Sequence, residues 1–228
     1  MQGTRGRRSN ADLRPARNVQ QVPLHTQSPV RRQRLRRLIT TSAAVALVAG
    51  CSAGAPPPPT PTEAGLTGVT TFSDLSHDHL EQDQTYPQTP PVGGVHWPPQ
   101  TEDGYGWLQC AVYPEPVVDE FAVHSLEHGA VWLTYQPGAQ PEAVRALTDL
   151  TAVNPDYVLV SPVPGQPAPF MATAWGLQLS VEDASDARLR EFTSTYAGGG
   201  QGGEKGADCA HGSTLQQAQT ALDRTRGG

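Results

Sequence analysis

A segment dense in proline and glycine is the feature that most constrains how this chain can fold. Residues 85–106 read TYPQTPPVGGVHWPPQTEDGYG, and nine of these 22 residues are Pro or Gly. Such a segment holds no long helix or strand, because proline lacks an amide donor and glycine favours turns. The wider irregular stretch, residues 69–113, still carries three histidines and two tryptophans. We therefore expect an ordered loop that packs on a core.

Regular elements follow this loop. Patterns rich in β-branched and aromatic residues predict strands at residues 110–113, 129–136, 156–162 and 170–180. Helices are predicted at residues 140–153 and 185–200, with a further short helix at 213–224. Residues 198–208, rich in glycine, read as a flexible arm. The predicted fold class is α+β: a small, mostly antiparallel sheet with two packed helices and a long ordered Pro/Gly-rich loop.

The N-terminal residues have the composition of an export signal. Residues 1–50 hold ten of the 16 basic residues and one acid, and the arginine cluster at 31–37 precedes an apolar run that ends at Cys51. That run is too short for a helix across about 30 Å of hydrocarbon. The sequence VAGC at 48–51 is typical of a bacterial lipobox, so we expect a lipoprotein signal peptide with a long basic n-region at 1–50 and lipidation of Cys51. An uncut membrane-anchoring helix is the alternative.

The lipid would hold the protein at the cell membrane, on its extracytoplasmic face. We expect a Pro-rich linker at 51–67, a globular domain at 68–212 and a C-terminal tail at 213–228. Residues 51–228 contain six basic and 21 acidic residues, a net charge of about −15. This charge argues against a nucleic-acid partner and suits either a cationic partner or simple solubility.

With Cys51 assigned to lipid, two cysteines remain, Cys110 and Cys209. An isolated pair outside the cytoplasm favours a disulfide over two free thiols. Thiolate ligands to a metal are the alternative.

Six of the seven histidines lie after residue 50, and five of them fall between positions 77 and 128: His77, His79, His96, His124 and His128. Neutral imidazole is a ligand for copper and zinc near pH 7. The two histidines at 124 and 128 share a face in a helix and also in a strand, because four residues suit both periods. The two at 77 and 79 share a face if their segment is extended.

The sequence HSLEH at 124–128 also fits the H-x-x-E-H pattern of some zinc peptidases, in which the Glu activates water. That pattern needs a longer helix and a downstream third ligand, for which Glu182 and Glu191 are candidates. Gly129 and the predicted strand behind it favour a polar corner at the edge of a strand. The direction of Glu127 separates the two cases.

Several segments resemble, in order, a bacterial domain-of-unknown-function family numbered 3105. They are YPQTPPVGGVHW, CAVYPEPV, VHSLEHGAVWLTYQPG and YVLVSPVPGQPAPFMATAWGLQL, followed by a late Cys. The resemblance covers about residues 68–211. It implies a secreted or membrane-anchored protein and supplies no activity. The shared features are His96, His124, Glu127, His128 and the two cysteines.

The leading hypothesis from these residues is an extracytoplasmic lipoprotein that binds a copper or zinc ion. His124 and His128 are the expected core ligands, His96 the third, and His77 or His79 the fourth. Glu127 would orient a ligating imidazole without touching the ion. A cell-envelope interaction module without metal, with the histidines in structural roles, is the alternative. A zinc peptidase is a remote one, and no catalytic residue is assigned.

Overall fold

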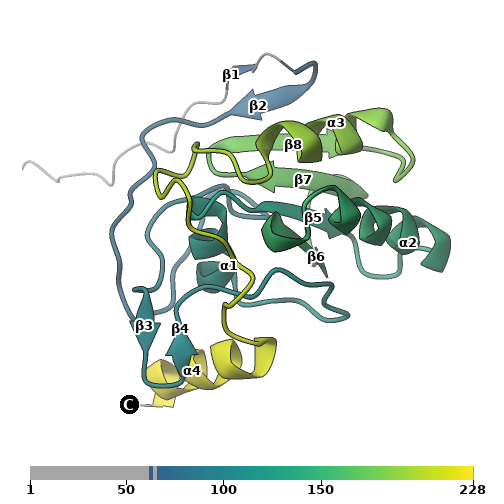
Figure 1. Cartoon of the computed structure of the whole chain (residues 1–228). Helices are drawn as coiled ribbons and strands as arrows, with labels where there is room; N and C mark the ends of the chain where they lie inside the picture. The colour runs from purple at the N-terminus through teal and green to yellow at the C-terminus, as the bar shows by residue number, and fades with distance from the viewer. Residues whose placement is uncertain (1–61, 64–65, 228) are drawn as a thin grey trace, which may run out of the picture. The chain divides into compact units, whose positions relative to one another are not determined.

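A mixed β-sheet forms the framework of the protein, shown in Figure 1 as a computed structural model. Its strands lie in the order β1-β2-β8-β7-β5-β6. Their bounds are Thr62–Glu63 (β1), Val69–Thr71 (β2), Leu177–Val181 (β8), Phe170–Ala174 (β7), Val131–Tyr135 (β5) and Val158–Pro162 (β6). Only β5 and β6 pair in parallel; the other neighbours are antiparallel. The predicted α+β class with a mostly antiparallel sheet is confirmed.

The structure describes residues 62–63 and 66–227, all of which belong to the unit Gly54–Gly228. The predicted signal peptide, Cys51 and most of the linker at 51–67 lie outside the described residues. Among the described helices, none has the length and apolar character needed to cross a membrane.

The described residues form four α-helices. They are α1 (Asp119–Glu127), α2 (Pro141–Asp149), α3 (Ala187–Tyr196) and α4 (Leu215–Gly227). The short 3-10 helices η1 (Leu150–Val153) and η2 (Pro155–Tyr157) continue from α2 toward β6. This helical connection lets β5 and β6 run in parallel, since a parallel pair needs a long crossover. Helices α2, α3 and α4 match the predicted ones.

Strands β5, β6 and β7 are buried on both faces, and alternate side chains divide between two hydrophobic clusters. In β5, Val131 and Leu133 pack in one cluster with residues of α2 and α3, while Trp132 packs in the other with Phe121 and Leu126 of α1. Helix α1 is therefore buried on one side of the sheet, with its polar residues inside the protein.

The Pro/Gly-rich loop packs against the α1 side, as expected. It contains the small hairpin of β3 (Gln100–Thr101) and β4 (Gly104–Tyr105), which lies beside α4 in Figure 1. The predicted disulfide is present: Cys110 and Cys209 are joined, with their Cα atoms 5.1 Å apart. It ties the C-terminal segment to the beginning of the core.

Three local predictions were wrong. The HSLEH segment is not the edge of a strand but the last turn of α1 and the residue that caps it. Residues 170–180 do not form one strand; they turn at Trp175 and Gly176, whose φ is +70°, and form the β7–β8 hairpin. Residues 110–113 make only an isolated bridge, between Val112 and Val160.

Candidate metal centre

Helix α1 brings three polar side chains of the centre together. His124 and Glu127 lie one turn apart in the helix, and His128 caps its C-terminal end. The helix stops there because Gly129 follows with φ +96°, a conformation that glycine adopts without strain. All three side chains are buried, and His124 is fully buried.

The loop supplies the other histidines. An isolated parallel bridge pairs His79 with His96: the amide of His96 donates to the carbonyl of Asp78 at 3.1 Å, and the amide of Leu80 donates to the carbonyl of His96 at 2.8 Å. The ring of His79 then packs edge-on against that of His96, with centroids 4.6 Å apart. Besides the β3–β4 hairpin, the irregular loop thus has an ordered pairing where the histidines lie.

Backbone carbonyls fix the orientation of three histidine rings. In each ring Nδ1 lies within hydrogen-bond distance of a carbonyl, and because a carbonyl only accepts, Nδ1 carries the hydrogen. The acceptors are Gly94 for His96 at 2.7 Å, Trp97 for His124 at 2.6 Å, and Asp208 for His128 at 3.0 Å. This arrangement is typical of metal-ligating histidines, since it leaves Nε2 to bind an ion.

The three Nε2 atoms meet different surroundings. His96 Nε2 lies 2.8 Å from Glu127 Oε2, and His128 Nε2 lies 3.0 Å from Glu204 Oε2. His124 Nε2 is buried and has no hydrogen-bond partner among the described residues. Burying a polar atom without a partner costs about 1–3 kcal/mol, so this nitrogen calls for an explanation.

The carboxylate of Glu127 faces histidines on both of its oxygens. Oε1 accepts a hydrogen bond from His77 Nδ1, and Oε2 lies near both His96 and His79, whose Nε2 is 3.6 Å away. Burial raises the pKa of Glu127, but the close approach of the His96 and His77 nitrogens outweighs burial and lowers the pKa to about 2. Glu127 is therefore an anion at neutral pH.

His124 is held in its neutral form. Burial lowers its pKa to about 2, and the neighbouring rings of His96 and His128 add to the effect. A neutral imidazole with a bare nitrogen and an ionised carboxylate are the forms in which these groups bind metals.

Two groups of side chains lie close enough together that they could hold a metal ion. One contains His79, His96, His124 and Glu127, and the other contains His124, His128 and Glu204; in each group the ligand atoms lie within 4.8 Å of one another. A tetrahedral ion with bonds of about 2.0–2.1 Å needs ligand atoms closer than this, so binding requires a small inward movement. His79, whose side chain is 30% exposed, is the freest to move.

The structure gathers all five histidines singled out in the sequence but divides them in an unexpected way. His96 and His128, expected to bind one ion together, lie in different groups and share only His124. His77 is in neither group; its ring stacks on Trp175 and its Nδ1 is hydrogen-bonded to Glu127. Glu127, expected to act without touching the ion, belongs to the four-residue group.

Sequence reasoning missed Glu204. The glycine-rich arm that carries it packs on α1: the amide of Gly198 donates to the carbonyl of Gly129 at 2.9 Å, and a Cβ on Gly202 would lie 2.1 Å from the carbonyl oxygen of Glu127. The expectation of a merely flexible arm is therefore wrong. Glu182 and Glu191, the expected candidates for a third ligand, are in neither group. One signal in the sequence could have indicated Glu204: it lies five residues before Cys209, and the disulfide holds Cys209 at the core.

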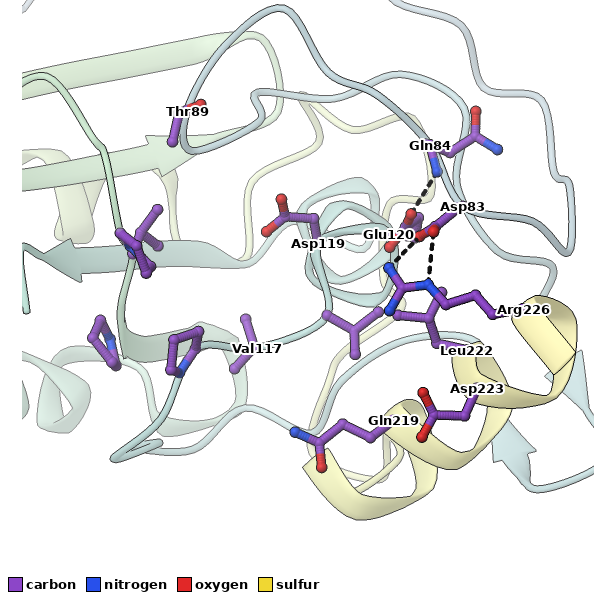
Figure 2. A pocket seen from close by; sticks show the side chains of 15 residues that line it. Asp83, Gln84, Thr89, Val117, Asp119, Glu120, Gln219, Leu222, Asp223 and Arg226 are labelled. Carbon is purple, nitrogen blue, oxygen red and sulfur yellow. Dashed lines mark hydrogen bonds and ion pairs between the residues drawn. The ribbon is translucent and has the colours of Figure 1, made fainter.

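A separate cavity lies at the other end of α1. It has a volume of about 680 Å³ and is lined by residues of the first turn of α1, of α4, of the end of β6 and of three loop segments, with none of the clustered histidines among them. Figure 2 shows Asp119 and Glu120 there, opposite Arg226, which is paired with Asp83. The cavity is thus distinct from the histidine centre.

Fold and site together define an α+β protein with a buried histidine–carboxylate cluster whose geometry suits a metal ion. Residues 77–211 match the family described as "Protein of unknown function (DUF3105)", and the chain belongs to this family. The matched range contains all five histidines, both acidic members of the cluster and both cysteines of the disulfide. Comparison with curated proteins and with solved structures gives no match.

Proposed function

We propose that the protein is an extracytoplasmic, lipid-anchored protein that binds a Zn²⁺ or Cu²⁺ ion through His79, His96, His124 and Glu127. The observation that supports this most is the buried, unpartnered Nε2 of His124, which lies among two further imidazoles and a carboxylate. An ion would satisfy this nitrogen and neutralise the buried charge of Glu127.

The ligand set favours these two ions over others. Imidazole suits zinc and copper, whereas calcium and magnesium take oxygen ligands. The group contains three imidazoles and one carboxylate and no sulfur, which favours Zn²⁺ or Cu²⁺ over Cu⁺. Four protein ligands fill a tetrahedral zinc shell, as in sites that hold an ion without catalysis.

Burial supports ion binding rather than peptide hydrolysis. A peptidase must admit its substrate to the ion, but His124 is fully buried and Glu127 nearly so. Both oxygens of Glu127 face histidines, so the carboxylate is not free to activate water.

The lipid anchor rests on the sequence at 31–51, and the disulfide supports it, since such bonds persist outside the cytoplasm. An ion held at the outer face of the membrane could be stored, buffered or passed on to another protein.

The test is a calorimetric titration of the metal-free protein with Zn²⁺ and, separately, with Cu²⁺. His124→Asn is the informative variant, because the amide nitrogen of Asn can still donate to the Trp97 carbonyl while the ligating Nε2 is lost. We expect its affinity for the ion to fall by about 100-fold, at the upper end of the losses seen even for residues around a metal site. His211→Asn, at an exposed histidine outside both groups, is the control and should bind as the wild type does. Equal weak binding by all three proteins would show that the histidines have structural roles.

A further inference from the structure

The two metal-holding groups depend on one shared nitrogen. His124 belongs to both, and its Nδ1 hydrogen is donated to the Trp97 carbonyl. The ring therefore has a single free lone pair, on Nε2. One lone pair binds one ion, so the two positions cannot both be fully ligated at the same time.

The two positions differ in what they leave open. The inner position, defined by His79, His96, His124 and Glu127, offers four ligands and closes a tetrahedral shell. The outer position, defined by His124, His128 and Glu204, offers three ligands and leaves one coordination site for water or for a ligand from a donor molecule.

The outer position also has a ligand at the protein surface. Glu204 has a side chain that is 42% exposed, while its partner at 3.0 Å, His128, is only 5% exposed. A carboxylate at the surface that contacts a buried imidazole forms a path from solvent to the cluster. Its negative charge also raises the local concentration of cations.

An alternative entry path for an ion, at His77, offers fewer ligands. His77 is 50% exposed and lines a cavity of about 360 Å³, but its Nδ1 is bonded to Glu127 and it belongs to neither group. An ion arriving there would meet a single ring stacked on Trp175 rather than a set of converging ligands.

We propose that an ion enters and leaves through the outer position at Glu204 and His128 and is handed by His124 to the inner position, where it is held. This inference rests on the proposed function. The ion exchanges ligands stepwise with His124 bound throughout, so no free ion has to cross the buried interior.

The experiment measures rates beside affinities in the full-length protein, with Zn²⁺ and, separately, Cu²⁺ as the probes. Stopped-flow mixing gives the association rate, and mixing the loaded protein with excess chelator gives the release rate. For Glu204→Gln we expect both rates to fall by about tenfold, from loss of the entry charge and ligand. The equilibrium affinity should change less than twofold, because the inner ligands are intact. The wild type should bind one ion per chain.

Matched variants make each outcome informative. Glu191→Gln, an exposed glutamate outside both groups, should leave both rates unchanged. Unchanged rates in Glu204→Gln, or slower rates in His77→Asn instead, would overturn the proposed route. Two ions per wild-type chain would overturn the exclusive sharing of His124. If Glu204→Gln lost as much affinity as His124→Asn does, the two positions would be a single site, and the proposed route would be wrong. Absence of binding by the wild type would remove the proposed function itself, a result distinct from all of these.

Discussion

Glu120 and Glu127 are two buried glutamates on α1 whose pKa values move in opposite directions. Glu127 has histidine nitrogens close to both of its oxygens, and its pKa falls to about 2. Burial raises the pKa of Glu120; the nearby Asp83 adds to this, while the amide of Gln84, at 2.6 Å, and the guanidinium of Arg226 only partly offset it. Two glutamates on one helix thus differ because their partners differ.

At Glu120 the raised pKa leads to a pH-dependent stability. The folded protein holds this proton more tightly than the unfolded chain does, so the ionised carboxylate destabilises the fold above its folded-state pKa. This cost disappears as the pH falls through that value toward 4.5, the ordinary pKa. We therefore expect Glu120→Gln to raise the free energy of unfolding at about pH 8 and to have little effect at about pH 4.

The measurement is denaturant unfolding at both pH values. The charged groups that line the same cavity are retained: Asp83, Asp119, Asp223 and Arg226 (Figure 2). Glu115→Gln, at an exposed glutamate in the loop before α1, is the control for removing one negative charge. An equal gain for Glu120→Gln at both pH values would contradict the assignment of the effect to this carboxylate.

At the scale of elements, the glycine-rich arm depends on its close contact with the end of α1. A methyl group at Gly202 would lie 2.1 Å from the carbonyl oxygen of Glu127, so the arm or the helix must shift. We expect Gly202→Ala to lower the free energy of unfolding by about 1–3 kcal/mol, the usual cost of overpacking. Gly200→Ala in the same arm is the matched control, because its nearest neighbour is the Lys205 side chain at an ordinary 3.5 Å. Equal stabilities of the two variants would show that the contact is not maintained.

The helices with an exposed face could be predicted from the sequence, and the buried helix α1 could not. Helix α2 has apolar residues on one side and polar ones on the other, and α3 ends near Gly198 as expected. Helix α1 is buried from Glu120 to Glu127, so its residues show no change of polarity from face to face. Its side chains form no cap, and a strand follows after three residues. The β7–β8 turn was missed because Trp175 continues the apolar pattern.

At the scale of the whole molecule, the disulfide closes a loop of 99 residues that contains most of the sheet. The chain-entropy model gives such a bridge about 4–5 kcal/mol of stabilisation. We expect Cys110→Ala/Cys209→Ala to lower the free energy of unfolding by roughly this amount in denaturant titrations. Reducing agent should produce a similar loss in the wild type and none in the double variant. An unchanged midpoint in the double variant would show that other contacts fix the C-terminal segment.

The Cys110–Cys209 disulfide also explains which residues of the centre could be predicted from the sequence. The five histidines lie within 52 positions of one another, and their residue type alone is enough to indicate metal binding. Glu204 lies 76 positions after His128, in a segment whose composition predicts no contact. Its place depends on the bridge at Cys209 and on the packing of the arm on α1. The division into two groups follows from ring orientations, which a sequence does not contain.

Those ring orientations have a further consequence for how the centre tolerates substitution. The groups that hold the rings at Gly94, Trp97 and Asp208 are main-chain carbonyls, present whatever side chain stands at these positions. In a scan of single substitutions, changes at these three positions would affect the centre only through their effect on folding. The alignment of these rings therefore depends on the path of the backbone, and relatives with different residues at Trp97 and Asp208 can keep it, whereas the φ of +118° favours glycine at Gly94.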